Sequence, residues 1–186
     1  MRFNLIVAMC RNNGIGYKGQ LPWQIPQDLR YFAQVTKGDG INAVVMGRKT
    51  WQSLPVPAGK PRGLPQRDNF VLTRTDQFDM LLNHDRLIKT FASLGDLETY
   101  LSTNDVYEDV WVIGGAQVYA QFLDEQKIEK CYITYIDADF ECDAFFPDLN
   151  PSKWKEIERT ESYDITYQCN VNYLVYQAIN QNTDCR

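Results

Sequence analysis

Short apolar runs alternate along this chain with segments that have helical spacing. The runs are rich in β-branched and aromatic residues and occupy residues 4–10 (NLIVAMC), 42–47 (NAVVMG), 69–74 (NFVLTR), 86–93 (RLIKTFAS) and 109–115 (DVWVIGG). Continuous apolar strands separated by helices are typical of a parallel sheet covered on both faces. The pattern therefore predicts an α/β fold with a mostly parallel central β-sheet and flanking helices.

Two helices carry start and stop signals. Pro26 stands at the start of the segment QDLRYFAQVTKG, and Gly38 closes it. Ser93 followed three residues later by Asp96 is a capping-box pattern before LGDLETYL. We therefore expect helices after both of these starts.

The pattern changes after residue 124. Residues 127–136 (KIEKCYITYI), 152–163 (SKWKEIERTESY) and 169–179 (CNVNYLVYQAI) have strand character, and no long helix separates the last two. These strands predict an antiparallel C-terminal hairpin that ends the sheet. Residues 55–68 (PVPAGKPRGLPQRD) are rich in Pro and Gly and predict a long surface connection. We expect one domain over residues 1–180 and a flexible tail over 181–186.

Composition excludes several classes of function. The chain has 186 residues and a formal net charge of -5, which argues against a nucleic-acid or membrane surface. Five cysteines without a CxxC pair indicate a reduced, cytoplasmic protein without a metal site. The one histidine, His84, lies in a polar stretch typical of a solvated loop, so a histidine-based nucleophile is not expected. The N-terminal apolar run is too short to span a bilayer.

Glycine turns mark candidate phosphate sites at strand ends. Gly114 and Gly115 stand between a strand and a helix, where free backbone N–H groups could meet an anion. A tight turn without a ligand explains this pattern equally well. Gly47 is followed by Arg48, Lys49 and Thr50, and another strand ends at Thr73 and Arg74. Either arginine alone would be a solvated surface charge, but together at matching strand ends they favour one ligand with several phosphates.

Asp28 lies in the first turn of the helix that follows Pro26. A carboxylate there could simply complement the helix dipole. However, helical spacing places it on one face with Leu29, Phe32 and Val35, which predicts a carboxylate directed at an apolar cavity. A flat heterocycle with an amidine-like edge could donate two parallel hydrogen bonds to such a group.

These residues resemble one family, dihydrofolate reductase. GIGYKGQLPW is similar to that family's signature of a glycine, four residues, an aliphatic residue and Pro-Trp, and Asp28 follows it at the family's spacing. The resemblance continues in order through VVMGRKTW, the VLTR strand end, VIGGAQVYAQFL, YITYID and DAFFP. Ala116 replaces a glycine common in the family, and the 55–68 segment is longer than in compact bacterial members.

The resemblance implies NADPH-dependent reduction of 7,8-dihydrofolate to tetrahydrofolate by a monomeric enzyme that antifolates such as methotrexate or trimethoprim-like compounds would inhibit. Asp28 would bind the pterin with support from Thr134, and protonation would come through water. Leu21 and Trp23 would belong to a mobile lid hinged at Gly16 and Gly19. The implied substrate contacts also include Ile6, Val7, Ala8, Leu29, Phe32, Leu54, Leu64, Ile113 and Arg67, the last of which would bind the glutamate α-carboxylate.

The implied cofactor contacts centre on the glycine turns. The resemblance implies a cis bond between Gly114 and Gly115, pyrophosphate contacts beside it, Tyr119 next to the nicotinamide, and Arg48 and Arg74 at the adenosine 2′-phosphate. The full set is Ala8, Ile15, Gly16, Gly47, Arg48, Lys49, Thr50, Leu72, Thr73, Arg74, Ile113, Gly114, Gly115, Ala116, Gln117, Val118 and Tyr119. Two alternatives stay open: a reductase of a related heterocycle, such as a pyrimidine reductase, and a pterin- or nucleotide-binding module without catalysis.

Overall fold

The computed structural model describes residues 1–56, 58–59, 61–75, 78–83 and 86–179, so the predicted tail at 181–186 and His84 lie outside the described residues. The strands in chain order are β1 (Arg2–Cys10), β2 (Gly14–Gly16), β3 (Ala43–Gly47), β4 (Asp68–Leu72), β5 (Asp79–Asn83), β6 (Arg86–Phe91), β7 (Asp109–Val112), β8 (Lys130–Ile136), β9 (Ala144–Phe145), β10 (Trp154–Asp164) and β11 (Cys169–Ala178). The helices are α1 (Pro26–Lys37), α2 (Arg48–Ser53), α3 (Leu94–Thr103) and α4 (Ala116–Asp124), with a short 3-10 turn, η1, at Arg11–Asn13.

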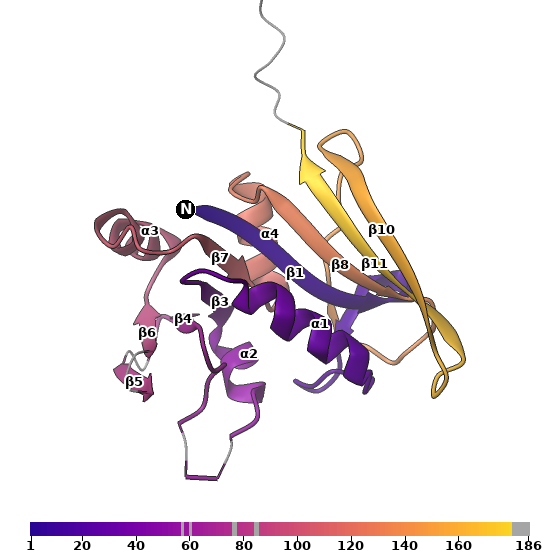
Figure 1. The fold of residues 1–186 in the computed structure, drawn as a ribbon, viewed down its shortest axis with the longest axis horizontal. Helices are drawn as coiled ribbons and strands as arrows, with labels where there is room; N and C mark the ends of the chain where they lie inside the picture. Colours follow the sequence, from indigo (N-terminus) through magenta and orange to yellow (C-terminus); the bar gives the residue numbers. More distant parts are fainter. Residues whose placement is uncertain (57, 60, 76–77, 84–85, 180–186) are drawn as a thin grey trace, which may run out of the picture.

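One nine-stranded sheet runs through the molecule in the order β10-β11-β8-β1-β7-β3-β4-β6-β5 (Figure 1). The central strands from β8 to β6 are parallel to one another. At one end β11 pairs antiparallel with β8 and β10 pairs antiparallel with β11, while at the other end β5 pairs antiparallel with β6. The predicted α/β class, mostly parallel sheet and antiparallel C-terminal hairpin are confirmed.

Both helix signals read from the sequence are present in the structure. Helix α1 begins at Pro26, and the backbone N–H of Gly38 donates to the Gln34 carbonyl at its end. At α3 the Ser93 hydroxyl accepts from the Asp96 backbone N–H at 3.1 Å and donates to the Asp96 carboxylate at 2.7 Å. Sequence reasoning missed β5, β2 and β9, of which the last two form a separate small antiparallel pair.

Successive apolar side chains of the central strands point alternately to the two faces of the sheet. One face packs with α3 and α4, and the other packs with α1 and α2. On β1, Leu5 and Val7 join the apolar cluster that holds α3 and α4, whereas Ile6 joins the cluster that packs with α1 and α2. The same division occurs on β3, where Val45 faces α4 while Val44 and Met46 face α1. Because successive side chains of a strand point to opposite faces, both layers are packed by the same strands.

The segment from residue 55 to 68 differs from the prediction at its C-terminal end. The described residues from Pro55 to Gln66 are exposed or half-buried, as a surface connection should be, but Arg67 is only 2% exposed and Asp68 only 8%. The side chain of Asn69 holds this return in place, since it accepts from the Leu64 backbone N–H at 2.8 Å and donates to the Leu64 carbonyl at 3.0 Å. The prediction of a surface connection is therefore wrong for these last two residues.

A buried hydrogen-bond network joins the amino ends of three strands. The Tyr107 hydroxyl, just before β7, donates to one oxygen of Asp68 at 2.7 Å, and the other oxygen of Asp68 accepts from the Leu87 backbone N–H on β6 at 2.9 Å. Tyr107 is 5% exposed. Its hydroxyl therefore satisfies a carboxylate that has little access to water.

We expect Tyr107→Phe to lower the free energy of unfolding by about 1–3 kcal/mol, because the buried Asp68 carboxylate would lose a donor. The measurement is urea unfolding followed by tryptophan fluorescence. Tyr163→Phe is the matched control, since Tyr163 is 57% exposed. Equal unfolding midpoints for Tyr107→Phe and Tyr163→Phe would contradict the expected contribution of this network to the free energy of unfolding.

Candidate active site

Asp28 is a buried acid in the first turn of α1. Asp28 is 5% exposed. It lies on the face of the sheet that packs with α1, near Thr134 on β8. Burial raises the pKa of the Asp28 carboxyl, and a hydrogen bond with the Thr134 hydroxyl acts in the opposite direction and lowers it. Within the described residues no cation forms an ion pair with it. The carboxylate thus keeps acceptor capacity for a ligand that carries donors.

Arg67 is a second buried charge, of opposite sign. Its guanidinium donates to the Thr36 hydroxyl on α1 and to the Pro65 carbonyl, and it lies 6.0 Å from the centre of the Phe32 ring. No carboxylate in the described part of the chain pairs with it, and burial lowers the pKa of Arg67 to about 10. A buried guanidinium without an anion is costly, so this position favours an anionic ligand group.

Helix α1 sets the distance between these two charges. Asp28 and Thr36, the partner of Arg67, are eight residues apart on α1, which corresponds to roughly 12 Å along the helix axis. Between them the α1 layer is apolar: Phe32, Leu54 and Leu64 pack against the cluster that contains Ile6 and Ile113. The arrangement suits an elongated ligand with a donor-rich ring at one end, an apolar middle and a carboxylate at the other.

The two glycine turns at strand ends lie side by side. The Gly47 backbone N–H donates to the Gly114 carbonyl at 2.7 Å, and the bond between Gly114 and Gly115 is cis. A Cβ on Gly115 would lie 3.3 Å from the Thr50 hydroxyl on α2. The N-termini of α2 and α4 therefore lie next to each other, and their free backbone N–H groups could bind one diphosphate.

The two predicted arginines stand at the neighbouring strand end. Arg48 donates to the Thr75 hydroxyl at 2.5 Å, and the Thr73 hydroxyl donates to the Thr75 carbonyl at 2.6 Å. Arg74 lies between these two threonines and is exposed. The turn after β4 thus brings Arg48 to the segment that carries Arg74, as a shared anion site requires.

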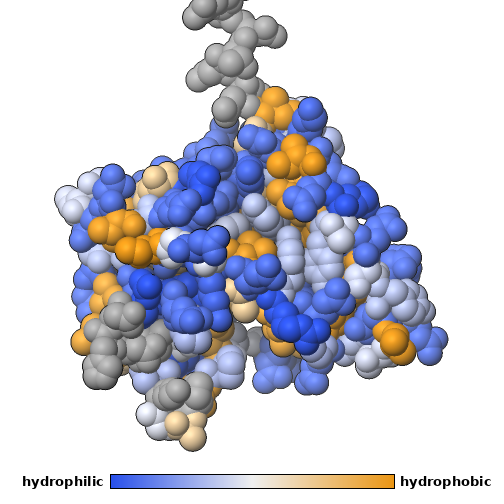
Figure 2. Space-filling model, viewed as in Figure 1, coloured by the Kyte–Doolittle hydropathy of each residue, from blue (hydrophilic) through white to orange (hydrophobic). Residues whose placement is uncertain are grey.

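The lid, which we define as residues 14–24, contacts both apolar layers: Ile15 packs against the cluster that holds α3 and α4, and Trp23 joins a cluster that also includes Tyr31 of α1. Gly19 has a positive φ of 77°, which suits glycine, and Leu21 is 47% exposed. Trp23 is 3% exposed and packs edge-on against Phe140, with 5.2 Å between the ring centroids. Figure 2 shows the lower outline of the molecule indented between the part that holds α2 and the part that holds the lid and α1.

The remaining predicted residues fall on both faces of the sheet. Ala8 faces the α1 side with Trp23, whereas Val7 points toward α4, so only the backbone of Val7 can line the α1 side. Tyr119 is buried, and its hydroxyl donates to the Ile6 carbonyl at 2.8 Å. Leu29 is 54% exposed while Asp28 is buried, so the expectation that these two neighbours share one buried face of α1 is wrong: consecutive helical residues are about 100° apart around the axis. The others lie around the glycine turns or the lid base: Ile15 and Leu72 half-buried, Val118 buried, and Gly16, Lys49, Ala116 and Gln117 at least partly exposed.

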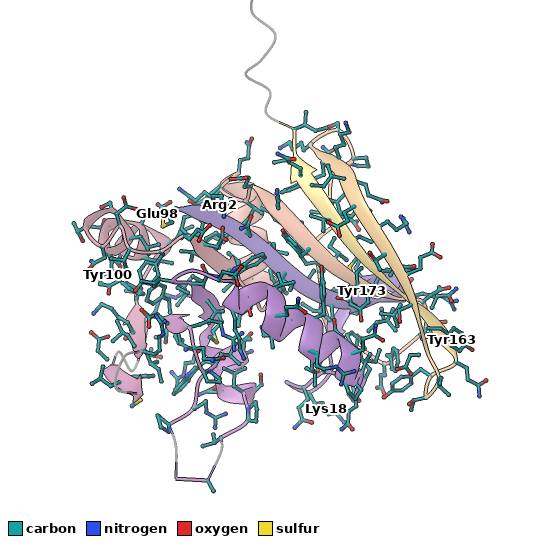
Figure 3. The ribbon with its side chains drawn as sticks, in the orientation of Figure 1. Arg2, Lys18, Glu98, Tyr100, Tyr163 and Tyr173 are labelled. Atoms are coloured by element: carbon teal, nitrogen blue, oxygen red, sulfur yellow. The ribbon has the colours of Figure 1, made fainter. Side chains whose placement is uncertain are left out.

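Sequence reasoning missed two residues at this site. Tyr173, labelled in Figure 3, lies on β11. It is directly opposite Thr134 in the β11–β8 register, and the centre of its ring lies 4.5 Å from that of Tyr31 on α1. The Tyr173 hydroxyl and the Trp23 indole N–H are buried and make no hydrogen bond to the described residues. Asp143 is the other residue: it holds the lid, since its backbone N–H donates to the Gly16 carbonyl and its side chain accepts from the Lys18 backbone N–H, each at 2.9 Å.

The described residues contain no cluster of His, Cys, Asp and Glu side chains suited to hold a metal ion. No helix among them is long and apolar enough to cross a membrane.

We expect Asp28→Asn to be more stable than the natural protein at pH 7. Because burial raises the pKa of Asp28 in the folded state, the folded protein binds this proton more tightly than the unfolded chain does. The stability that protonation gives is full below the unfolded pKa of about 3.9 and is lost as pH rises through the folded value. The advantage of Asp28→Asn should therefore shrink as pH falls from 7 through the folded pKa of Asp28 in urea unfolding. A constant difference, or the same gain in the exposed control Asp124→Asn, would contradict this.

Comparison with known proteins connects this geometry to one family. A family model described as dihydrofolate reductase matches residues 2–178. The dihydrofolate reductase of Drosophila melanogaster is 41% identical over 164 residues, which cover 84% of this chain and 85% of that protein. That of Haemophilus influenzae is 38% identical over 161 residues, 87% of this chain and 88% of the relative.

A longer relative matches as well. The bifunctional dihydrofolate reductase-thymidylate synthase of Daucus carota is 34% identical over 198 residues, which cover 98% of this chain and 36% of that protein. The family model, over residues 2–178, takes in every strand and helix described above and both buried charges of the site. The chain belongs to the dihydrofolate reductase family.

Proposed function

We propose that this protein catalyses the NADPH-dependent reduction of 7,8-dihydrofolate to 5,6,7,8-tetrahydrofolate, a reaction of one-carbon metabolism. The observation that carries the proposal is the pair of buried, opposite charges, Asp28 and Arg67, held at the two ends of an apolar stretch of α1. Dihydrofolate has the complementary order of groups: a pterin with adjacent N–H donors, an aminobenzoyl ring and a glutamate carboxylate.

Asp28 would bind the pterin edge. Its carboxylate would accept from the pterin amino group and the neighbouring ring N–H, while the Thr134 hydroxyl holds it in orientation. Phe32 and Ile113 would enclose the ring, and Leu54 and Leu64 the aminobenzoyl group. Arg67 would bind the glutamate α-carboxylate through its planar guanidinium.

Proton delivery would use water close to Asp28. The Trp23 indole N–H and the Tyr173 hydroxyl are both buried without a partner among the described residues, and both belong to one apolar cluster, to which the lid contributes Trp23. Water at this place would satisfy these groups and could pass a proton to the pterin nitrogen. Closing the lid would exclude bulk water from the reaction.

The cofactor would lie across the two glycine turns. When bound, NADPH supplies the hydride for the pterin carbon beside the protonated nitrogen. The backbone around Gly114 and Gly115, with Thr50 and Lys49, would bind the pyrophosphate, and Tyr119 would line the nicotinamide pocket. Arg48 and Arg74 would bind the adenosine 2′-phosphate and so select NADPH over NADH.

We further propose that the protein acts as a cytoplasmic monomer. Every group assigned above comes from one chain, so no residue of a second copy is needed. The odd number of cysteines supports a reducing compartment. Antifolates such as methotrexate or trimethoprim-like compounds would occupy the Asp28 end of the site.

Loss of NADPH absorbance in the presence of 7,8-dihydrofolate tests the reaction. We expect rapid oxidation that a diaminopyrimidine antifolate inhibits and that NADH supports poorly. Asp28→Asn should reduce kcat by about two to four orders of magnitude, the usual contribution of a positioned acid, and should keep NADPH affinity. A folded protein that oxidised neither cofactor would favour a binding module, and oxidation only with a pyrimidine substrate would favour the related reductases.

Arg67→Lys should raise KM for dihydrofolate by about tenfold or more while leaving kcat within a few-fold, because lysine keeps the charge but loses the bidentate geometry. A dihydropterin without the aminobenzoyl-glutamate tail is the matched control substrate. The Arg67→Lys variant should reduce that compound as well as the natural protein does. Equal losses with both substrates would remove Arg67 from tail recognition.

A further inference from the structure

Two cysteine side chains that are distant in sequence touch at the base of the lid. Cys10 ends β1 and is fully buried, Cys142 is half-buried in the segment before β9, and their sulfur atoms are 3.7 Å apart. Both sulfurs lie close to Gly14, the first lid residue. A Cβ at this position would lie 2.4 Å from the Cys142 Sγ and 2.8 Å from the Cys10 Sγ, so only glycine fits there. No other two thiols in the described ranges are in contact.

The backbone next to Cys142 already holds the lid. Asp143 makes two hydrogen bonds to it, from its backbone N–H to the Gly16 carbonyl and from the Lys18 N–H to its carboxylate. On the same short segment, β9 pairs with β2, with Gly14 opposite Phe145. The 3-10 turn is joined too, since the Phe146 N–H donates to the Asn13 carbonyl at 2.8 Å. A bond at Cys142 would therefore act directly on the lid base.

We propose that Cys10 and Cys142 are a reversible redox modification site that takes glutathione disulfide or a similar small disulfide as its oxidant. The disulfide formed there fixes the segment before β9 to the end of β1 and so stiffens the base of the lid.

The reaction balances as two thiol-disulfide exchanges. The thiolate of Cys142, the more accessible of the two, attacks one sulfur of glutathione disulfide and releases one glutathione thiolate. Cys10 then loses its proton and attacks the Cys142 sulfur of the mixed disulfide, which releases the second glutathione. The two protein thiols lose two protons and two electrons in total, and the small disulfide is reduced to two thiols.

The environment of the thiols sets the rate of this exchange. Burial, together with the hydrogen bond to Cys10, raises the pKa of Cys142 to about 11. The thiolate is therefore scarce near neutral pH, and the exchange is slow there. Below that pKa its rate rises about tenfold for each pH unit. The negative charge of the neighbouring Asp143 also raises the pKa of Cys142.

The test uses the full chain with Cys185→Ser, so that one thiol outside the described residues cannot take part. The protein is equilibrated with mixtures of reduced and oxidised glutathione at pH 8.5, alkylated, and analysed by intact mass and peptide mapping. We expect two thiols to become protected together, a cross-linked peptide that joins Cys10 to Cys142, and full reversal by dithiothreitol. Protection that stops at a glutathione adduct on Cys142, or a cross-link to Cys131 or Cys169, would overturn the proposal.

Two variants and one further readout keep the test independent of activity. Cys142→Ser and Cys10→Ala should each abolish the cross-link, and the peptide map of the parent decides the matter even if one variant fails to fold. In the oxidised parent, hydrogen exchange of the backbone amides at residues 14–18 should slow by about tenfold, because the cross-link makes local opening of the lid base less favourable. A cross-link with unchanged exchange in that stretch would refute the effect on the lid.

Discussion

The parallel alignment of the central strands is the constraint on which the site depends. Because β1, β3, β4 and β7 run in one direction, their carboxyl ends meet at one edge of the sheet. That edge receives Gly47, Thr73 and Gly114 from three separate parts of the chain, and the hydrogen bond from Gly47 to Gly114 joins two of them directly. The starts of α2 and α4 then follow the ends of β3 and β7 directly in the chain.

The site retains polar groups that the fold itself does not satisfy. Asp28 and Arg67 are buried without an ion-pair partner among the described residues, and the Trp23 indole and the Tyr173 hydroxyl lack hydrogen bonds there. Each such group opposes folding, because a buried donor or charge without a partner has lost its hydration. The apolar layers on the two faces of the sheet offset this cost, and a complementary ligand would remove most of it. The same groups thus weaken the empty protein and determine which ligand it can hold.

Much of this arrangement could be predicted from the sequence, for physical reasons that differ between residues. Apolar runs and helix caps are local, so eight of the strands and the starts of α1 and α3 were read correctly. Strand β5 was missed because Asp79–Asn83 is a short edge strand with few β-branched residues. The burial of Arg67 depends on Asn69 and Thr36, and the role of Tyr173 depends on the register between β11 and β8. Such contacts between distant segments have no local signal.

Helix α1 sets the distance between Asp28 and Thr36, and this limits where the chain can gain or lose residues. Deleting one residue between Asp28 and Thr36 would shorten their separation by about 1.5 Å and rotate one of them by about 100° around the axis, off the face that meets the sheet. The connection after α2 has no such restriction, since most of its described residues are exposed and irregular. Evolutionary insertions and deletions should therefore collect in residues 55–66, while the interval from 28 to 36 keeps its length.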